Sequence, residues 1–437
     1  MNFPSQPTLS VVIPTHNRRE AVTRALGALS KQVYPAAEFE VIIVADGCAD
    51  DTVFFLQKQL SSYPFMIRIL EQQGMGPAAA RNAGARQAQG QTLIFMDDDI
   101  EPLPGFVGAH CNAHNKPRRV VMGPCPPRLT KQKGFFRHAL QGWWEVMFDR
   151  MRQPGYRFSY TDLLSGNLSL SRSLFMEVGG FDPRFICHED YELGVRLLQA
   201  ETEFVFEPSA EGYHHEMSDL RRSLERKFQE GKADVALGEL YPQLCSTLPM
   251  HLLFRKVFLA SRIMLFLAFY LSWAGDRISR LVETLLSFAE GAKIRRVWRH
   301  LLKGLHGYWY LRGVAQELPH FGAIRYYLLE RPAVIADALE VNLADGIAQV
   351  KQQIDEKQPM NLIIYYGTTE IGKITQPGRE RLRGKHLYHI LRHELKAHTL
   401  RALAQANDLD IPVERETLIE KCDEFIAFQE KHGYAPS

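Results

Sequence analysis

The sequence predicts an α/β protein built on a mostly parallel β-sheet, and two observations carry that prediction. In the first 100 residues, short apolar runs alternate with stretches whose apolar residues recur at helical spacing. Strands that alternate with helices form parallel sheets, because each helix returns the chain to the start of the next strand. The run 93–96 is apolar throughout, which is typical of a strand covered on both faces, and three aspartates follow it.

Each element of this region follows from its local pattern. The strands share dense apolar, often β-branched runs and are expected at residues 9–15, 39–44, 66–70 and 93–96. The helices share apolar residues at helical spacing or a high alanine content and are expected at residues 18–33, 50–60 and 78–89. Neither G-x-G-x-x-G after a strand nor a Walker A sequence occurs, so neither a dinucleotide fingerprint nor a P-loop is present.

Composition narrows the class of protein. The chain has 437 residues, which exceeds one ordinary domain, and 46% hydrophobic residues suit a sizeable core. A net charge of +2 gives no general attraction for nucleic acid, and we expect no nucleic-acid partner. The six cysteines form no C-x-x-C pair, which favours reduced thiols over a zinc site or a disulfide scaffold. The beginning of the sequence does not read as a signal peptide, so a cytoplasmic location is expected.

Three consecutive carboxylates, Asp97 to Asp99, follow the fourth expected strand. Open α/β sheets bind their ligands at the carboxyl ends of the strands. Adjacent acids repel one another unless a cation lies among them, and oxygen ligands suit Mg²⁺ or Mn²⁺ better than a softer metal. A solvated acidic turn explains the triplet equally well when it is taken alone.

A series of motifs gives the triplet its context. In order, the motifs are Val12–Thr15, Val44–Gly47 with Asp50–Thr52, Ala80–Gly84, Phe95–Asp99, Ser165–Leu170 and Val178–Asp182. The series resembles family 2 glycosyltransferases, whose Rossmann-like GT-A fold binds nucleotide-sugars. One departure is Ala45, where the family often has a second acid. The resemblance implies a GT-A domain over residues 1–218. The residues themselves predict a basic amphipathic helical region at 219–330 and, beyond the boundary at Arg331-Pro332, a small α+β module at 331–437.

The resemblance implies an inverting transferase that takes a sugar from a nucleotide-diphosphate donor. It places nucleotide-binding residues at the strand ends, namely Pro14, Thr15, Asn17, Asp46, Arg81, Asp97 and Asp98. The carboxylate of Asp46 suits the imide N–H of uracil, which favours a UDP-sugar, although a plain turn also explains Asp46-Gly47. The planar fork of Arg81 suits phosphate oxygens, and a helix-surface cation is the alternative.

The family also implies the catalytic and metal-binding residues. A Glu-Asp pair in the family opens a helix near the sugar, and its aspartate commonly deprotonates the acceptor hydroxyl. This implies that Asp190 is the base and that Glu189 orients it or binds the acceptor. An acid-rich first helical turn, favoured by the helix dipole, is the alternative. The resemblance further implies a Mn²⁺ or Mg²⁺ site made of Asp97, Asp99 and a histidine, and the sequence leaves His214 and His215 open.

Aromatic residues between 131 and 160 are candidates for an acceptor groove, because sugar rings present apolar faces to indoles. We expect acceptor contacts from Trp143, Trp144 and Asn167, with core packing as the alternative for the two tryptophans.

The second half of the chain has a charge pattern that predicts a membrane-binding surface rather than a catalytic site. Residues 251–312 contain eleven Lys or Arg and three Asp or Glu, interleaved with large apolar residues. This pattern is typical of amphipathic helices on an anionic membrane surface, and a helical subdomain with a basic outer face is the alternative. The apolar run 263–274 is too short to cross a bilayer. We therefore expect peripheral attachment to the inner face of the plasma membrane and a glycan or lipid-linked acceptor.

In the last part, two strands at 361–367 and 370–374 are expected to form a hairpin, with helices at 387–406 and 415–432.

Two other functions fit parts of the sequence. A sugar-phosphate nucleotidyltransferase shares the sheet, but it expects a glycine-rich phosphate loop after the first strand. A non-catalytic carbohydrate-binding or scaffolding protein has no need of both an acid cluster and a Glu-Asp pair. The expected function is therefore sugar transfer in the synthesis of a glycan or cell-surface polysaccharide.

Overall fold

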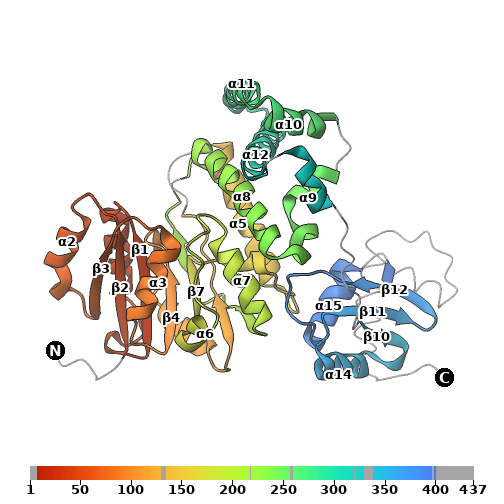
Figure 1. The fold of residues 1–437 in the computed structure, drawn as a ribbon. Coiled ribbons are helices and arrows are strands. Elements are labelled where there is room, and N and C mark those ends of the chain that lie inside the picture. The colour runs from red at the N-terminus through yellow and green to blue at the C-terminus, as the bar shows by residue number, and fades with distance from the viewer. Residues whose placement is uncertain are drawn as a thin grey trace. The chain divides into compact units, whose positions relative to one another are not determined.

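The computed structural model describes residues 7–128, 134–216, 218–255, 259–318, 320–328, 338–395 and 398–399, and Figure 1 labels their helices and strands. The described residues divide into two compact units. The first unit contains those up to 148 and those from 160 to 328, and the second contains 149–159 and those from 338 onward. The first unit therefore holds both the sheet and the helices that were expected to form separate parts.

A seven-stranded sheet forms the base of the first unit, in the order β3-β2-β1-β4-β7-β6-β8. Its strands are β1 (Leu9–Thr15), β2 (Phe39–Asp46), β3 (Met66–Gln72), β4 (Thr92–Met96), β6 (Arg119–Met122), β7 (Asn167–Ser171) and β8 (Glu203–Phe206). Only β7 runs antiparallel to its neighbours in this sheet. The mostly parallel α/β sheet predicted from the sequence is confirmed, although β7 was not predicted as a strand.

The middle of the sheet is covered on both faces, as the apolar runs predicted. Val11 of β1 pairs with Val41 of β2 on one side and with Ile94 of β4 on the other. All three side chains are fully buried. Because β1, β2 and β4 are parallel, their carboxyl ends lie at the same edge of the sheet, and the polar residues that follow them meet there.

Helices and a small second sheet complete this part of the unit. The helices are α1 (Arg19–Leu29), α2 (Thr52–Gln59), α3 (Pro77–Gln87), α4 (Phe106–Ala113), α6 (Arg172–Glu177) and α7 (Glu189–Gln199). The predicted helices at 18–33, 50–60 and 78–89 are thus confirmed with shorter bounds. β5 (Ile100–Pro102) and β9 (Gly212–His214) form an antiparallel pair in which Ile100 faces His214. This pairing brings the segment after the aspartate triplet beside the two histidines.

The remaining helices of the first unit are α5 (Phe135–Met151, whose last residues belong to the second unit), α8 (Leu220–Leu240), α9 (Pro249–Arg255), α10 (Leu259–Tyr270), α11 (Ser272–Gly291), α12 (Arg295–Glu317) and α13 (Ile324–Leu328). The long helices α8 and α12 approach closely through glycines: a Cβ on Gly313 would lie 1.9 Å from the carbonyl oxygen of Phe228. Among the described residues, no helix has both the length and the apolar character that a bilayer crossing requires.

Buried polar contacts tie α8 and α12 to α7. His188, which precedes α7 in a left-handed conformation (φ 61°), contacts Asp234 of α8 through Nδ1 at 2.9 Å. Tyr310 of α12 donates to the other Asp234 oxygen at 2.5 Å. Tyr241 donates to Glu192 of α7 at 2.7 Å. These bonds set the position of the α7 N-terminus, where the Glu-Asp pair lies.

The second unit contains β10 (Ala338–Asn342), α14 (Ile347–Lys357), β11 (Asn361–Tyr366), β12 (Thr369–Ile374) and α15 (Leu387–His389), which runs into a π-helical turn, Ile390–Glu394. The predicted hairpin is confirmed, because β11 and β12 pair antiparallel. β10 and α14 were not predicted. The predicted helix at 387–406 lies partly outside the described residues, and the one at 415–432 lies wholly outside them.

Candidate active site

A cavity of about 360 Å³ lies at the carboxyl ends of β1, β2 and β4. Its lining residues come from the strand ends and the start of α3, namely Pro14, Thr15, His16, Arg18, Asp46, Pro77, Arg81, Asp97, Asp98 and Asp99. The set contains every residue that the sequence marked for nucleotide binding except Asn17. Residues far apart in sequence thus meet at the edge of the sheet where α/β proteins bind ligands.

Asp98 is the most enclosed of the three aspartates, and the end of β1 holds it in place. Thr15 donates from Oγ1 to Asp98 Oδ2 at 2.7 Å. Arg18 bridges Asp98 Oδ1 and Asp99 Oδ2, each at 3.0 Å. Burial raises the pKa of Asp98 to about 6, although Arg18 opposes the rise. The positive charge beside Asp98 and Asp99 therefore comes from the guanidinium group of Arg18.

Arg81 links the aspartate triplet to the start of α7. Its two terminal nitrogens donate to Asp97 Oδ1 at 2.6 Å and to Glu189 Oε1 at 2.9 Å. The side chain is only 4% exposed. Arg81 was expected to bind phosphate oxygens, and in this state both terminal nitrogens bind protein carboxylates instead. The arginine therefore fixes the distance between the acid cluster and the Glu-Asp pair.

Asp46 and Asn17 shape the loops around the cavity. Asp46 accepts hydrogen bonds from the backbone N–H of Met75 and of Gly76, each at 2.7 Å. Asn17 accepts from the N–H of Ala49 at 2.7 Å and lies outside the set of lining residues. Asp46 thus holds the loop before α3 against the end of β2, which is the turn role that the sequence left as the alternative to nucleotide binding.

The two histidines lie in different surroundings. His214 Nε2 lies 3.4 Å from Asp99 Oδ1, whereas His215 Nε2 contacts Glu101 at 2.6 Å. Burial pushes the pKa of His214 down, but Asp99 and Glu216 hold it above its usual value. The histidine beside the aspartate triplet is therefore His214.

The side chains of Asp97, Asp99 and His214 are the candidate ligands of a divalent cation. Asp99 Oδ1 is buried and has no hydrogen-bond partner among the described residues. Carboxylate oxygens beside an imidazole suit Mn²⁺ or Mg²⁺. Across the described part of the chain, however, no three His, Cys, Asp or Glu side chains converge as a metal-binding group, since Asp97 is turned to Arg81. Asp99 and His214 are suitable ligand types and lie close enough together for such an ion. Asp97 is also a suitable ligand type, but its carboxylate is turned to Arg81.

Glu189 and Asp190 open α7, as the sequence predicted. Asp190 is partly buried, and burial together with the charge of Glu189 raises its pKa to about 6. A carboxylate with that pKa is ionised at neutral pH and accepts a proton more readily than an ordinary aspartate. Asp190 does not line the cavity itself, but Glu189 and Arg81 connect it to Asp97.

The three residues expected to contact an acceptor have different positions. Trp144 is buried and lies edge-on to His214, with ring centroids 6.0 Å apart. Trp143 is 50% exposed. Asn167 is buried, and its amide bonds the carbonyl of Ala210 and the ring of His110, each at 2.8 Å. Of the three, Trp143 alone offers an open face, and Asn167 has the position of a structural amide.

Known protein families match the part of the chain that forms this cavity. The sequence pattern described as Glycosyl transferase family 2 matches residues 10–179, and that described as the N-terminal domain of galactosyltransferase matches residues 146–218. Residues 10–179 belong to the family 2 glycosyltransferases. The match spans β1 to β7 and includes every residue that lines the cavity.

Two curated relatives and one solved structure illustrate what the chain is similar to. A validoxylamine A glucosyltransferase of Streptomyces hygroscopicus subsp. jinggangensis is 34% identical over 225 residues, which cover 44% of this chain and 51% of that protein. An uncharacterised glycosyltransferase of Bacillus subtilis is 27% identical over 307 residues, covering 58% of this chain and 76% of that protein. A mannosyltransferase of Pyrobaculum calidifontis, solved with GDP-Man and Mn²⁺, gives a TM-score of 0.45 at 16% identity and covers 69% and 86% of the two chains. The chain spans about half the length of the first curated relative.

Two residues at or near the site were not predicted from the sequence. Arg18 lies three residues after β1, and the pairing of β1 with β4 predicts that it can reach the aspartates. Asp234, which holds His188, comes from α8, beyond the residues matched by the family. The sequence carried a signal for Arg18, because it follows a predicted strand, and none for Asp234, because no local pattern indicates that α8 packs against the start of α7.

Proposed function

We propose that the protein is an inverting glycosyltransferase that moves a sugar from a UDP-sugar to an acceptor hydroxyl in glycan or cell-surface polysaccharide synthesis. The observation that carries this proposal is the cavity at the strand ends, which gathers the aspartate triplet, Asp46 and Arg81 in a family 2 domain. The Glu-Asp pair is joined to the same cavity through Arg81.

The donor is held by its two ends. Asp46 accepts the imide N–H of uracil through Oδ2, which accepts only the N–H of Gly76 and retains a lone pair, whereas Oδ1 already accepts from Gln72 and Met75. Asp97, Asp99 and His214 would hold Mn²⁺ or Mg²⁺, with Asp97 released from Arg81. A divalent cation bound there supplies positive charge that stabilises the leaving nucleoside diphosphate.

Asp190 accepts the proton of the acceptor hydroxyl. The hydroxyl oxygen forms a bond to the anomeric carbon on one face of the sugar, and the bond to the diphosphate oxygen breaks on the opposite face. A single displacement of this kind inverts the anomeric configuration. The raised pKa of Asp190 supports the role, since the base must be ionised before the reaction and hold the proton after it. Glu189 positions this group by its bond to Arg81.

The decisive experiment is a screen of nucleotide-sugars for binding and transfer, with and without Mn²⁺, on wild type, Asp190→Asn and Asp99→Ala. We expect one donor to bind in a metal-dependent manner. Asp190→Asn should bind that donor normally and transfer its sugar about 10² to 10⁴ times more slowly. Donor binding that ignores EDTA and survives Asp99→Ala would contradict the metal site. A wild type that binds sugar but transfers none would favour the non-catalytic carbohydrate-binding alternative.

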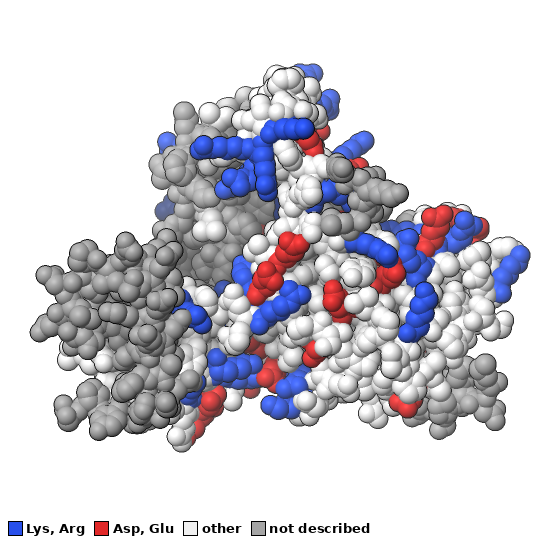
Figure 2. All heavy atoms as spheres, turned by 180° about the vertical axis from the view of Figure 1, so that it is seen from behind, with Lys and Arg blue, Asp and Glu red and all other residues white. Residues whose placement is uncertain are grey.

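A membrane-surface location completes the proposal, and the helices α10 and α11 support it. Their large apolar side chains are between 45% and 71% exposed, namely Ile263, Phe266, Tyr270, Trp273, Ile278, Leu281, Leu285 and Phe288. Exposed Arg262, Arg277 and Arg280 lie on the same two helices. Figure 2 shows basic side chains gathered over the upper helical region with few acidic ones among them. Apolar residues with arginines beside them suit the surface of an anionic bilayer.

Flotation of the whole protein with liposomes tests this location. We expect flotation with anionic vesicles, much less with zwitterionic vesicles, and loss of flotation in Leu281→Glu/Phe288→Glu, since the two charges replace exposed apolar side chains on α11. Equal behaviour of the two vesicle types, or of variant and wild type, would argue against the membrane face.

A further inference from the structure

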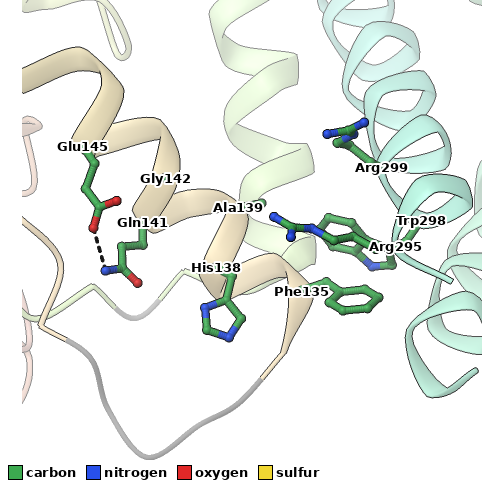
Figure 3. A pocket seen from close by; sticks show the side chains of 9 residues that line it. All are labelled: Phe135, His138, Ala139, Gln141, Gly142, Glu145, Arg295, Trp298 and Arg299. Carbon is green, nitrogen blue, oxygen red and sulfur yellow. Dashed lines mark hydrogen bonds between the residues drawn. The ribbon is translucent and has the colours of Figure 1, made fainter. Parts of the chain in front are cut away.

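A second cavity, of about 660 Å³, lies in the first unit between α5 and the first turns of α12. Figure 3 shows its walls: His138, Gln141 and Gly142 belong to α5, and Arg295 and Arg299 belong to α12. The cavity shares no lining residue with the candidate active site. Its size falls within the range of about 300 to 1,000 Å³ that is typical of small-molecule sites. It is therefore a separate place where a ligand can bind.

The cavity carries positive charge that the described residues do not neutralise. Neither Arg295 nor Arg299 has a side-chain hydrogen bond or an ion pair within the described ranges. The one lining carboxylate, Glu145, accepts a hydrogen bond from Gln141 Nε2 at 2.7 Å. Two arginines thus face the cavity without a matched anion, and Figure 3 shows Arg295 extending from α12 toward α5.

The same two arginines lie near the N-terminus of α12, where a positively charged side chain is least favourable for a helix. α12 begins at Arg295 with no acid in its first turn and no side-chain cap. A helix N-terminus already carries partial positive charge, and like charges four residues apart repel. An anion beside this turn offsets both unfavourable terms and accepts hydrogen bonds from uncapped backbone N–H groups.

The floor of the cavity is aromatic. Trp298 is 2% exposed and packs edge-on against Phe135, with ring centroids 5.6 Å apart. The indole N–H of Trp298 is buried and has no acceptor in the described part of the chain. An aromatic floor beneath a cationic rim suits an anion that is joined to a sugar ring or a hydrocarbon chain, because either body packs on aromatic rings.

From these observations we infer that the cavity binds an organic phosphate, with Arg295 and Arg299 on the phosphate group and the partly exposed ring of Phe135 against the body of the ligand. Arginine suits this ligand because its planar fork matches phosphate oxygens. A sugar phosphate and a lipid phosphate share this chemistry.

The position of α5 relates this site to the active site. Gln141 lines the cavity, and Trp144, three residues further along the same helix, lies edge-on to His214. Three helical residues span about 4.5 Å along the axis. The cavity and the residue beside His214 thus lie within one turn of the same helix, a spacing that suits an acceptor whose phosphate binds in this cavity. The acceptor role rests on the proposed function, whereas the binding of organic phosphate does not.

The test measures binding to the full chain by titration calorimetry with inorganic phosphate, glucose 1-phosphate and decyl phosphate below its micelle concentration. One variant is Arg295→Gln/Arg299→Gln. A second is Gly142→Leu, because a Cβ at Gly142 meets no atom within 4 Å and the new side chain occupies cavity space while both arginines are kept. The matched control is Arg296→Gln, an exposed arginine of the same turn that does not line the cavity.

We expect an organic phosphate to bind more tightly than inorganic phosphate, with affinity at least about tenfold weaker in both variants and within about twofold of wild type in the control. Preference for decyl phosphate identifies a lipid source, and preference for glucose 1-phosphate identifies a soluble one. Binding of inorganic phosphate alone, or equal affinities in all four proteins, would overturn the assignment.

Two further readouts separate this inference from misfolding and from the proposed function. Gly142→Leu should keep the melting temperature of wild type or exceed it, since leucine favours a helix interior more than glycine does. If the wild type transfers no sugar but the binding pattern holds, the proposed function fails and the phosphate site stands. If transfer occurs and phosphate affinity ignores the variants, the function stands and the phosphate site fails.

Discussion

At the scale of single residues, the candidate active site is a set of carboxylates held in different states by their neighbours. Asp98 is bonded by Thr15 and Arg18, whereas Asp97 is bonded by Arg81. Asp99 keeps one buried oxygen that accepts no hydrogen bond among the described residues and has the ring of His214 beside it at 3.4 Å. Identical side chains thus differ in what they can still bind, and this difference supports Asp99 as the ligand most ready for a cation.

The rate of transfer should depend on pH through Asp190. Burial and the charge of Glu189 raise its pKa to about 6, so the carboxylate is ionised at pH 7 and becomes protonated as the pH falls below 6. A protonated carboxyl cannot take the acceptor's proton, and kcat should fall about tenfold per pH unit on that limb. The profile is measured at saturating donor and metal, so that Asp98, whose pKa is also raised to about 6, does not contribute through donor binding. A kcat that stays level from pH 7 to pH 5 would contradict the assignment.

Arg81 should be essential for stability as well as for geometry. Arg81→Met leaves Glu189 without its partner in a site where that side chain is 11% exposed. An uncompensated buried charge costs about 3 kcal/mol or more, which urea unfolding measures. The control is Arg19→Met, since Arg19 and its partner Asp51 have side chains that are 40% and 56% exposed and the loss of this surface pair should cost at most about 1 kcal/mol. A similar cost for both variants would show that Arg81 is not the structural link described above.

At the scale of elements, close packing of α8 on α12 supports α7, the helix that carries the proposed base. The two long helices provide Asp234 and Tyr310, which hold His188 at the start of α7. The Glu-Asp pair follows directly. A helix pair that lies outside the residues matched by the family therefore sets the position of the proposed base.

Two glycines of α12 give opposite predictions. Gly313→Ala places a Cβ 1.9 Å from the carbonyl oxygen of Phe228, so the helices must move apart, at a cost of about 1 to 3 kcal/mol in unfolding free energy. Gly304 lies in the same helix, where an added Cβ would meet no atom within 4 Å, and Gly304→Ala should stabilise the protein by about 0.5 to 1 kcal/mol. Chemical denaturation of both variants measures the difference. Equal effects would mean that α8 and α12 do not pack as closely as described.

At the scale of the whole molecule, α7 of the matched domain and the long helices α8 and α12 share one core. Phe185 and Val195 belong to the same buried cluster as Val235 and Leu311. The expected boundary near residue 218 divides this cluster between two parts. The helices are accordingly part of the folded catalytic unit and also carry the surfaces proposed for lipid and phosphate.

This shared core predicts the outcome of truncation. A chain that ends at residue 218 exposes the faces that α8 and α12 cover, and burial of apolar area is the main source of folding free energy. We expect such a chain to aggregate or to lack a cooperative thermal transition in circular dichroism, whereas the full chain melts cooperatively. A cooperative transition in the short chain would show that residues up to 218 fold independently.

The sequence by itself determined the alternation of strands and helices, the acid cluster after β4 and the motif order of the family. These features are local, because hydrophobic periodicity and short motifs are written within a few residues of one another. The strand bounds of β1 agree residue for residue with the pattern, and the hairpin of the second unit was also predictable.

Tertiary structure alone decided which charges meet. Arg81 reaches Glu189 across 108 residues, a contact that no local pattern encodes. The choice between His214 and His215 depended on the pairing of β9 with β5, since successive side chains of an extended chain point to opposite faces. The cavity between α5 and α12 likewise exists only because two helices distant in sequence pack together. Periodicity predicts which side chains face inward, but long-range packing selects their partners.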